Sequence, residues 1–185
     1  MQVLGISGSL RAQSHNTRLL REAAELLPGG AELVLFEGLK GVPPYDEDDD
    51  VDPAPAGVAH LRAALAGADA VLFATPEYNS SVPGQLKNAL DWASRPLPTN
   101  PLRNKPVAVI GASTGMFGAV WAQAELRKVL AALGARVVDA ELAVGRSAAR
   151  LDEHGRLLDD ELAEQLAAGL DTLVSAVRER TLLAA

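Results

Sequence analysis

The chain contains no cysteine, and aromatic residues make up only 4% of its 185 residues. The absence of cysteine excludes disulfides, thiolate catalysis, zinc sites with cysteine ligands and redox-active dithiols. Redox activity would therefore need an organic cofactor to carry the electrons. No apolar run is long enough to cross a bilayer. The formal charge of −7 argues against general nucleic-acid binding, although a small anionic ligand responds to local groups rather than to net charge.

Alanine, leucine and valine are abundant, and a hydrophobic content of 48% with dispersed charges is typical of a globular protein. The length suits one full core, so we expect a single domain over residues 1–185. Val3–Ile6 already has the pattern of a core strand, and no basic segment precedes it. We therefore expect no signal peptide, a cytoplasmic location, and no membrane or nucleic-acid partner.

Short apolar runs alternate with segments of helical periodicity along the chain. Strands are predicted at Gln2–Ser7, Ala31–Phe36, Asp69–Thr75, Pro106–Ile110 and Arg136–Ala140. Helices are predicted at Asn16–Leu27, at Pro55–Ala66, after Ser81 as an N-cap, up to Leu133, and after Asp159 as an N-cap. This alternation predicts the α/β class, with a parallel sheet covered by helices on both faces. With strand order 2-1-3-4-5, a ligand would bind at the carboxyl ends of strands 1 and 3.

Turns rich in small residues follow the first, third and fourth predicted strands, so they should meet at one edge of the sheet. The first turn, Gly5–Asn16, offers neutral hydrogen-bonding side chains, and Arg11 supplies a charge. A helix beginning near His15 would add unpaired N–H groups and the positive end of its dipole, so an anion fits there. The alternative is an ordinary strand-to-helix turn, with Ser14 as the N-cap and Arg11 in solvent.

The other two turns carry weaker local signals. In Pro76–Ser80, backbone amides could meet the edge of a planar heterocycle, with Tyr78 packing nearby. The alternative is that Tyr78 is merely a half-buried aromatic residue and Glu77 a solvated charge. Ser113–Gly115 again offers small donors and close backbone approach, and its alternative is a plain strand-to-helix loop.

Several known motifs do not match this sequence. The first turn has neither the G-x-G-x-x-G nor the G-x-x-x-x-G-K-[ST] pattern. Gly5–Ser9 nearly matches G-x-S-x-G, but serine replaces the last glycine, and the only late histidine, His154, lies in a polar turn. The acidic run Asp46–Asp52 lacks the glycine and glutamate of an EF-hand, so we expect a solvated loop. The histidines have no ligand-like spacing, and no metal site is expected.

Three segments of the chain resemble the NADPH-dependent FMN reductase family, which includes NAD(P)H:quinone, azo-dye and chromate reductases. These segments are GSLRAQSHN from Gly8, PEYNSSVPGQLKNALDW from Pro76 and ASTGMFGAVWAQAELRKVL from Ala112. The second is the most characteristic of the family. Together they cover the crevice-forming parts of the chain from Gln2 to about Ala140.

The resemblance implies a flavodoxin-like three-layer sandwich with FMN in the crevice. By motif position, the phosphate would be held by Ser9, Arg11, Ser14, His15 (through its backbone) and Asn16. The isoalloxazine ring would be lined on one side by Pro76, Glu77, Tyr78 and Asn79, and on the other by Ser113, Thr114 and Gly115.

The activity implied by the resemblance is hydride transfer from NAD(P)H to FMN and then to a quinone, free flavin, azo dye or chromate, by ping-pong turnover. The flavin would carry the chemistry, so no catalytic side chain is expected. Family members are commonly homodimers or homotetramers, with a variable loop, here Pro43–Asp52, near the interface. The alternative is an FMN-binding electron carrier or redox sensor without NAD(P)H turnover. Arg11 favours the reductases, since flavodoxin phosphate turns usually lack arginine. FMN could also be a substrate.

Overall fold

The computed structural model describes residues 1–184 and contains a five-stranded parallel sheet in the order β2-β1-β3-β4-β5, as predicted. The strands are β1 (Gln2–Ser7), β2 (Glu32–Leu35), β3 (Ala70–Thr75), β4 (Pro106–Ala112) and β5 (Arg136–Val144). The helices are α1 (His15–Leu26), α2 (Ala56–Gly67), α3 (Gly84–Ala93), α4 (Val120–Ala132), α5 (Ser147–Arg150) and α6 (Asp160–Ala184). Short 3-10 helices are η1 (Leu39–Gly41), η2 (Glu47–Asp49) and η3 (Leu97–Thr99).

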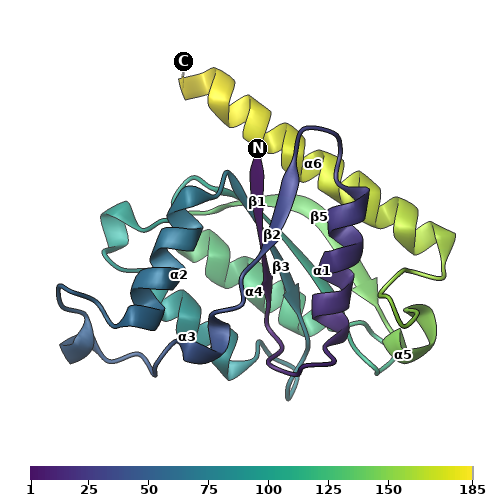
Figure 1. Cartoon of the computed structure of the whole chain (residues 1–185), viewed down its shortest axis with the longest axis horizontal. Coiled ribbons are helices and arrows are strands. Elements are labelled where there is room, and N and C mark those ends of the chain that lie inside the picture. Colours follow the sequence, from purple (N-terminus) through teal and green to yellow (C-terminus); the bar gives the residue numbers. More distant parts are fainter. Residues whose placement is uncertain (185) are drawn as a thin grey trace.

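Helices cover both faces of the sheet, which makes a three-layer sandwich (Figure 1). Side chains from α1 and α6 pack on one face, and those from α2, α3 and α4 pack on the other. Successive strand residues point to opposite faces, so Leu72 joins the first cluster while Val71 and Phe73 join the second. Every residue of β3 and β4 is buried, which explains why their sequences are almost continuously apolar.

Parallel strands place all their carboxyl ends at one edge of the sheet, which is the lower edge in Figure 1. The chain winds from β1 outward to β2 and then returns across β1 to β3. The winding direction therefore reverses between β1 and β3, and the connections leaving these strands diverge there. A crevice forms where they separate, at the position predicted from the strand order.

Most element ends lie within one or two residues of the prediction, but the end of β5 and the N-cap of α3 differ from it. β5 extends to Val144 rather than ending at Ala140, because its later residues continue to pair with β4. Ser81 does not cap α3, which begins at Gly84 with Pro83 before it. Ser81 is instead held in a tight turn, where it exchanges two backbone hydrogen bonds of 3.1 Å with Tyr78. The predicted N-cap Asp159 is confirmed, since its carboxylate accepts from the N–H of Leu162 at 3.4 Å.

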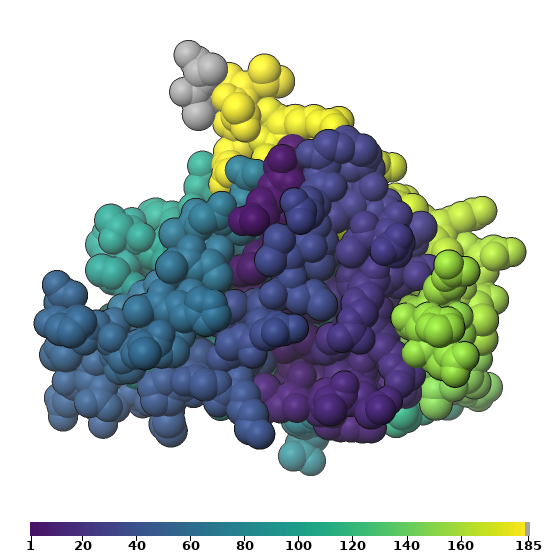
Figure 2. Space-filling view, in the orientation of Figure 1, coloured from purple at the N-terminus to yellow at the C-terminus, as the bar shows by residue number. Residues whose placement is uncertain are grey.

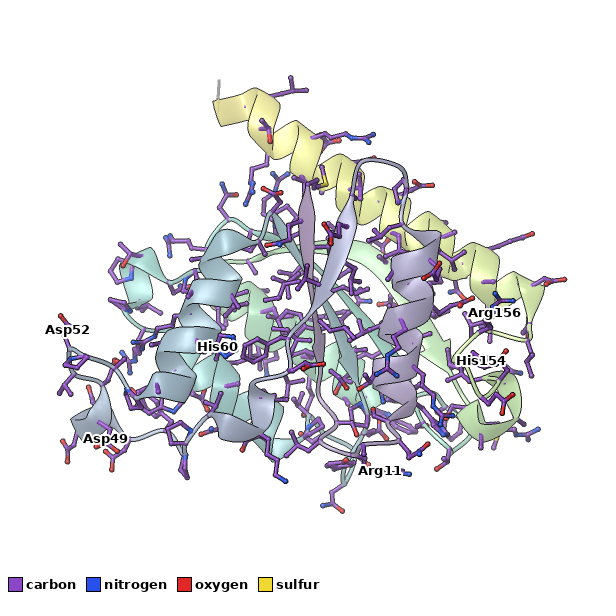
Figure 3. All side chains as sticks on the ribbon, in the orientation of Figure 1. Arg11, Asp49, Asp52, His60, His154 and Arg156 are labelled. Carbon is purple, nitrogen blue, oxygen red and sulfur yellow. The ribbon has the colours of Figure 1, made fainter. Side chains whose placement is uncertain are left out.

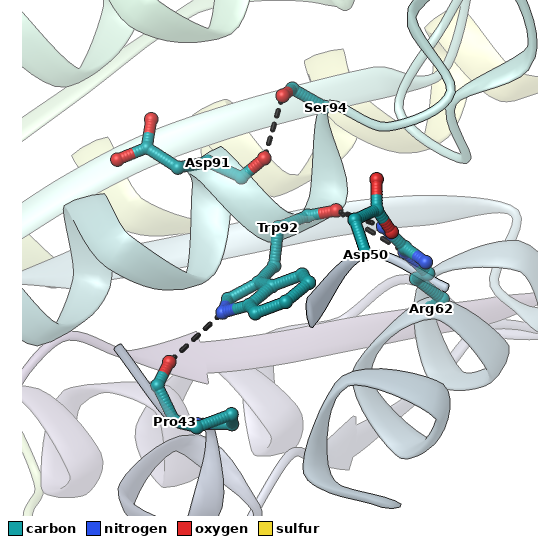
Figure 4. Close-up of polar contacts among 6 residues, drawn as sticks. All are labelled: Pro43, Asp50, Arg62, Asp91, Trp92 and Ser94. Atoms are coloured by element: carbon teal, nitrogen blue, oxygen red, sulfur yellow. Dashed lines mark hydrogen bonds and ion pairs between the residues drawn. The ribbon is translucent and has the colours of Figure 1, made fainter. Parts of the chain in front are cut away.

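The polar loop between β2 and α2 is fastened to two helices (Figure 4). The indole of Trp92 is fully buried and donates to the carbonyl of Pro43 at 2.9 Å. Arg62 on α2 forms an ion pair of 2.9 Å with Asp50 and also donates to the carbonyl of Trp92. The acidic segment is therefore largely exposed at its tip but has a defined course along α2 and α3. Across residues 1–184, no helix is both long and apolar enough to cross a membrane.

Candidate functional site

The three turns predicted to form a site lie together around a cavity of about 150 Å³ at the carboxyl edge of the sheet. Its lining contains every predicted site residue except Asn79 and Gly115, together with Ala112. The lining residues are Ser9, Arg11, Ser14, His15, Asn16, Pro76, Glu77, Tyr78, Ala112, Ser113 and Thr114. These residues come from the connections after β1, β3 and β4, so the fold gathers segments that are about one hundred residues apart in the sequence.

The first turn has the features of an anion-binding helix start. Gly8 donates its N–H to the carbonyl of Ala74 at 2.8 Å, and a Cβ at Gly8 would lie 2.9 Å from Leu86. Ser14 is the N-cap of α1, because its hydroxyl accepts from the N–H of Thr17 at 3.1 Å. The N–H groups of the two residues that begin α1 precede the first helical hydrogen bond, so the helix supplies no partner for them.

Asn16 has a structural role that the sequence did not indicate. Its side-chain amide donates to the carbonyl of Ala112 and accepts from the N–H of the same residue, both at 2.9 Å. These two bonds join the beginning of α1 to the end of β4, and both partners are buried. The side chain therefore binds Ala112 through both its donor and its acceptor, and α1 supplies no partner for the backbone N–H of Asn16.

Glu77 is neither a solvated charge nor a free polar group. Its carboxylate accepts from the N–H groups of Trp121 and Ala122, at 3.1 and 3.2 Å. α4 has no capping side chain of its own, because Ala119, in the left-handed conformation, stands at its N-cap position. Glu77 therefore caps α4 from a distant turn, and its negative charge lies at the positive end of that helix.

The second turn projects Tyr78 from the sheet edge. Asn79 and Ser80 have positive φ angles of 53° and 60°, which allow the tight reversal between Tyr78 and Ser81. The hydroxyl of Ser81 also donates to Glu125 on α4. Tyr78 is 48% exposed, so its ring is available beside the cavity. The turn is thus anchored on both sides of a half-exposed aromatic ring.

A fourth loop, between β5 and α5, holds the third turn and was not identified from the sequence. The N–H of Arg146 donates to Gly115 at 2.7 Å, and that of Ser147 donates to Ser113 at 3.0 Å. Gly145 allows this approach, because a Cβ there would lie 2.0 Å from the carbonyl oxygen of Met116. The segment carries no motif, and its role depends on backbone contacts that a single sequence does not reveal.

The same loop also contacts the first turn through His15. The Nδ1 atom of His15 lies 2.6 Å from the hydroxyl of Ser147, which is completely buried. Burial lowers the pKa of His15, and the positive charges of Arg18 and Arg11 lower it further. Burial and the two arginines therefore bias the imidazole toward its neutral form.

The acidic run lies away from this cavity. Asp49 and Asp52 occupy the outer end of the molecule beyond α2, whereas Arg11 lies at the lower edge below the strands (Figure 3). Within the part of the chain that the structure describes, no three histidine, aspartate or glutamate residues gather as metal ligands. The cationic and N–H-rich first turn is thus separated from the most acidic segment.

The family described as NADPH-dependent FMN reductase matches residues 1–149. The chain is 44% identical to an NAD(P)H-dependent FMN reductase of Pseudomonas aeruginosa, over 96% of both chains. It is 36% identical to a 2-hydroxy-1,4-benzoquinone reductase of a Burkholderia species, over 97% of this chain and 98% of the relative.

Among solved structures, the chain is similar to FerB, a flavoenzyme NAD(P)H:(acceptor) oxidoreductase from Paracoccus denitrificans. The TM-score is 0.86 with 36% identity, over 96% of this chain and 97% of FerB. A flavodoxin of Pseudomonas aeruginosa matches with a TM-score of 0.59 and 20% identity, covering 92% of this chain and 99% of the flavodoxin. The second similarity shows a shared fold alone.

The pair of bonds between Asn16 and Ala112 leads to a stability prediction. Asn16→Ala leaves the N–H and carbonyl of Ala112 buried without partners, so the free energy of unfolding should fall by about 2–4 kcal/mol. Urea denaturation of the cofactor-free protein measures this change. Gln13→Ala, at a neighbouring exposed residue, is the control and should change the free energy of unfolding by less than about 0.5 kcal/mol. Equal stabilities for the two variants would contradict the assigned role of Asn16.

Proposed function

The chain belongs to the NADPH-dependent FMN reductase family, and from this premise we propose that its first turn binds the phosphate of FMN and that its second and third turns line the isoalloxazine ring. It is an NAD(P)H-dependent flavin oxidoreductase. The observation that carries the site proposal is the single cavity formed by all three turns where the sheet reverses its winding direction. When bound, FMN supplies the hydride and electron transfer that no side chain here provides.

The first turn suits a phosphate monoester because it combines several kinds of donor. His15 and Asn16 open α1 and line the cavity, so their N–H groups and the positive dipole end of the helix can meet an anion there. Arg11 lines the same cavity with an exposed guanidinium, which can donate two parallel hydrogen bonds to phosphate oxygens. Ser9 adds a hydroxyl at the rim. We assign Ser14 chiefly to holding the helix start, since its hydroxyl already serves as the N-cap.

The second and third turns would fit opposite sides of a planar ring. The second turn contributes Pro76 and Tyr78 to the lining of the cavity, and the third turn contributes Ser113 and Thr114. The tight turn at Asn79 and the hydrogen bonds to Gly115 keep both walls in place, although neither residue borders the cavity. This rigidity would position the ring without a large ordering cost on binding.

The finer points of the proposal concern the acceptor, the assembly and the location. The relatives named as quinone reductases support a quinone-type acceptor. We extend this proposal to free flavin, azo dye and chromate as further acceptors, within one FMN-binding domain of a cytoplasmic protein. Exposed apolar side chains beside the third turn support a homodimer or homotetramer, because such a patch favours burial against another chain. They are Met116, Phe117, Val120 and Trp121.

The reductase function is tested by anaerobic stopped-flow mixing of the FMN-loaded protein with NADPH. The flavin absorbance should be lost on a catalytic timescale and should return when a benzoquinone is added. Because one open cavity would serve both substrates in turn, steady-state double-reciprocal plots should be parallel. Flavin that stays oxidised after mixing would instead support an electron carrier or redox sensor. Dialysis followed by a flavin spectrum distinguishes a tightly held cofactor from a dissociating substrate.

Arg11→Ala should weaken FMN binding by about 1–3 kcal/mol, the scale of a charge-assisted contact with phosphate. Fluorescence titration of the cofactor-free protein with FMN measures the loss. Riboflavin lacks the phosphate, so its affinity should be nearly unchanged by the same substitution. Arg21→Ala, an exposed arginine farther along α1, is the matched control. An unchanged FMN affinity would remove Arg11 from the phosphate site.

His15 should make FMN binding depend on pH. A bound phosphate favours the imidazolium, so the pKa of His15 should be higher in the complex than in the free protein, where burial and Arg18 and Arg11 lower it. FMN binding then takes up protons. The affinity for FMN is greatest below the pKa that His15 has in the free protein, and it falls as pH rises through the pKa that His15 has in the complex.

FMN titrations over a pH series measure this dependence in the wild type and in His15→Gln. In His15→Gln, the part of the pH dependence of FMN affinity that is due to His15 should be lost. The part due to titration of the phosphate itself should remain. Superimposable pH profiles for the two proteins would show that the imidazole does not sense the phosphate.

A further inference from the structure

A second cavity, of about 310 Å³, lies on the other side of the first turn. We call it the β2 pocket, since it is closed on one side by Leu10 and Arg11 and on the other by Phe36, Glu37, Leu39 and Lys40, in the segment that follows β2. The first turn and this segment lie side by side at the lower edge of the molecule (Figure 2). Ser9 and Arg11 border both cavities, so the β2 pocket adjoins the proposed FMN site.

The lining of the β2 pocket combines an apolar base with charged groups at its rim. Phe36 and Leu39 are 8% and 4% exposed, whereas Glu37 and Lys40 are exposed to solvent. In residues 1–184, neither of these charged side chains, nor Arg11, forms an ion pair with another side chain. The pocket therefore offers two cations, one carboxylate acceptor and an apolar surface to a ligand. Its volume is within the range of small-molecule sites.

The segment that forms the outer wall is held in place by the body of the protein. The N–H of Phe36 donates to Gly5 at 2.9 Å, and the side chain of Gln85 on α3 donates to the carbonyl of Leu39 at 2.8 Å. Gly38 permits the close course of the chain, since a Cβ there would lie 2.7 Å from the ring of Phe36. A ligand would thus meet a preformed wall, with little backbone ordering required.

The position of the pocket suits one end of a ligand whose other end reacts at the flavin. β2 is separated from β4 by β1 and β3, and neighbouring strands lie about 4.8 Å apart. The pocket is therefore roughly 10–14 Å from the turns proposed to line the isoalloxazine ring. An extended dinucleotide has two aromatic ends joined by two riboses and a pyrophosphate, and it can cross this span over the first turn.

We propose that the β2 pocket binds the adenosine end of NAD(P)H. Lys40 contacts the 2′-phosphate of NADPH, and Glu37 accepts a hydrogen bond from the 2′-hydroxyl that NADH carries in place of this phosphate. This inference rests on the proposed function. The adenine ring lies on the apolar base formed by Phe36 and Leu39, with Leu10 on the opposite side, and Arg11 adds positive charge from the wall shared with the first cavity. Lys40 then favours the binding of NADPH, and Glu37 favours the binding of NADH.

The opposite actions of these residues provide the test. The dissociation constants of NADPH and NADH are measured on the FMN-loaded protein from the concentration dependence of flavin reduction in stopped flow. Lys40→Gln should weaken NADPH binding about five- to tenfold and should have little effect on NADH binding. The loss of NADPH affinity should be smaller at high salt, because salt screens the charge. Glu37→Gln should weaken NADH a few-fold and tighten NADPH, because a repulsive charge is lost. Lys128→Gln, an exposed lysine on α4, is the matched control.

A fragment of the dinucleotide tests the location directly. Adenosine 2′,5′-bisphosphate should compete with NADPH in the reductive half-reaction of the wild type, and Lys40→Gln should weaken this competition by the same factor as it weakens NADPH. Reoxidation of the reduced flavin by a benzoquinone should proceed at the same rate in every variant. That rate separates a binding effect from a general loss of structure.

The two levels of proposal fail in different ways. If NADPH does not reduce the flavin of the wild type, the proposed function itself is lost, and this inference with it. If the wild type is reduced but both variants keep the NADPH-to-NADH affinity ratio of the control, the assignment of the β2 pocket is overturned while the reductase function stands. Competition by the bisphosphate that is insensitive to Lys40→Gln likewise overturns it.

Discussion

The pair of hydrogen bonds between the side chain of Asn16 and the backbone of Ala112 is the constraint on which the site depends. α1 and β4 are not sequence neighbours, and β3 lies between β1 and β4 in the sheet. The two bonds cross this gap beneath the crevice and set the spacing between the first and third turns. Because both partners are buried, their loss would leave unsatisfied polar groups, which makes this spacing costly to change.

Two other contacts of the same kind complete the frame. Glu77 bonds the start of α4, and Ser147 bonds both His15 and the third turn. In each case a polar side chain from one connection reaches a distant connection. The walls are therefore fixed before a ligand arrives, which is the arrangement expected of a site that positions a cofactor. Side chains and backbone N–H groups both contribute to this frame, while the N–H groups that open α1 have no partner within the helix.

Positive and acidic groups lie in different regions of the molecule. The chain carries a formal charge of −7, yet its first turn presents a helix start and Arg11, and Lys40 stands on the neighbouring segment. The acidic run is held away from this edge by the contacts of Arg62 and Trp92 (Figure 4). A negatively charged protein thus keeps Arg11, Lys40 and the positive end of α1 together at one edge, apart from its most acidic segment.

The sequence by itself determined the alternation of strands and helices and the positions of the small-residue turns, because apolar periodicity and turn residues are local signals. The predicted strand order was confirmed, and the residues that the family resemblance placed around the crevice line the cavity, apart from Asn79 and Gly115. The sequence also carried a family resemblance that the relatives confirm. The tertiary structure alone decided that Asn16 joins two turns, that Glu77 caps a distant helix, that Ser81 closes a tight turn instead of capping α3, and that the loop at Gly145 supports the third turn. Each of these depends on a hydrogen-bond partner or a close approach that the surrounding residues do not specify. Such pairings become visible only when the folded chain brings the two groups together.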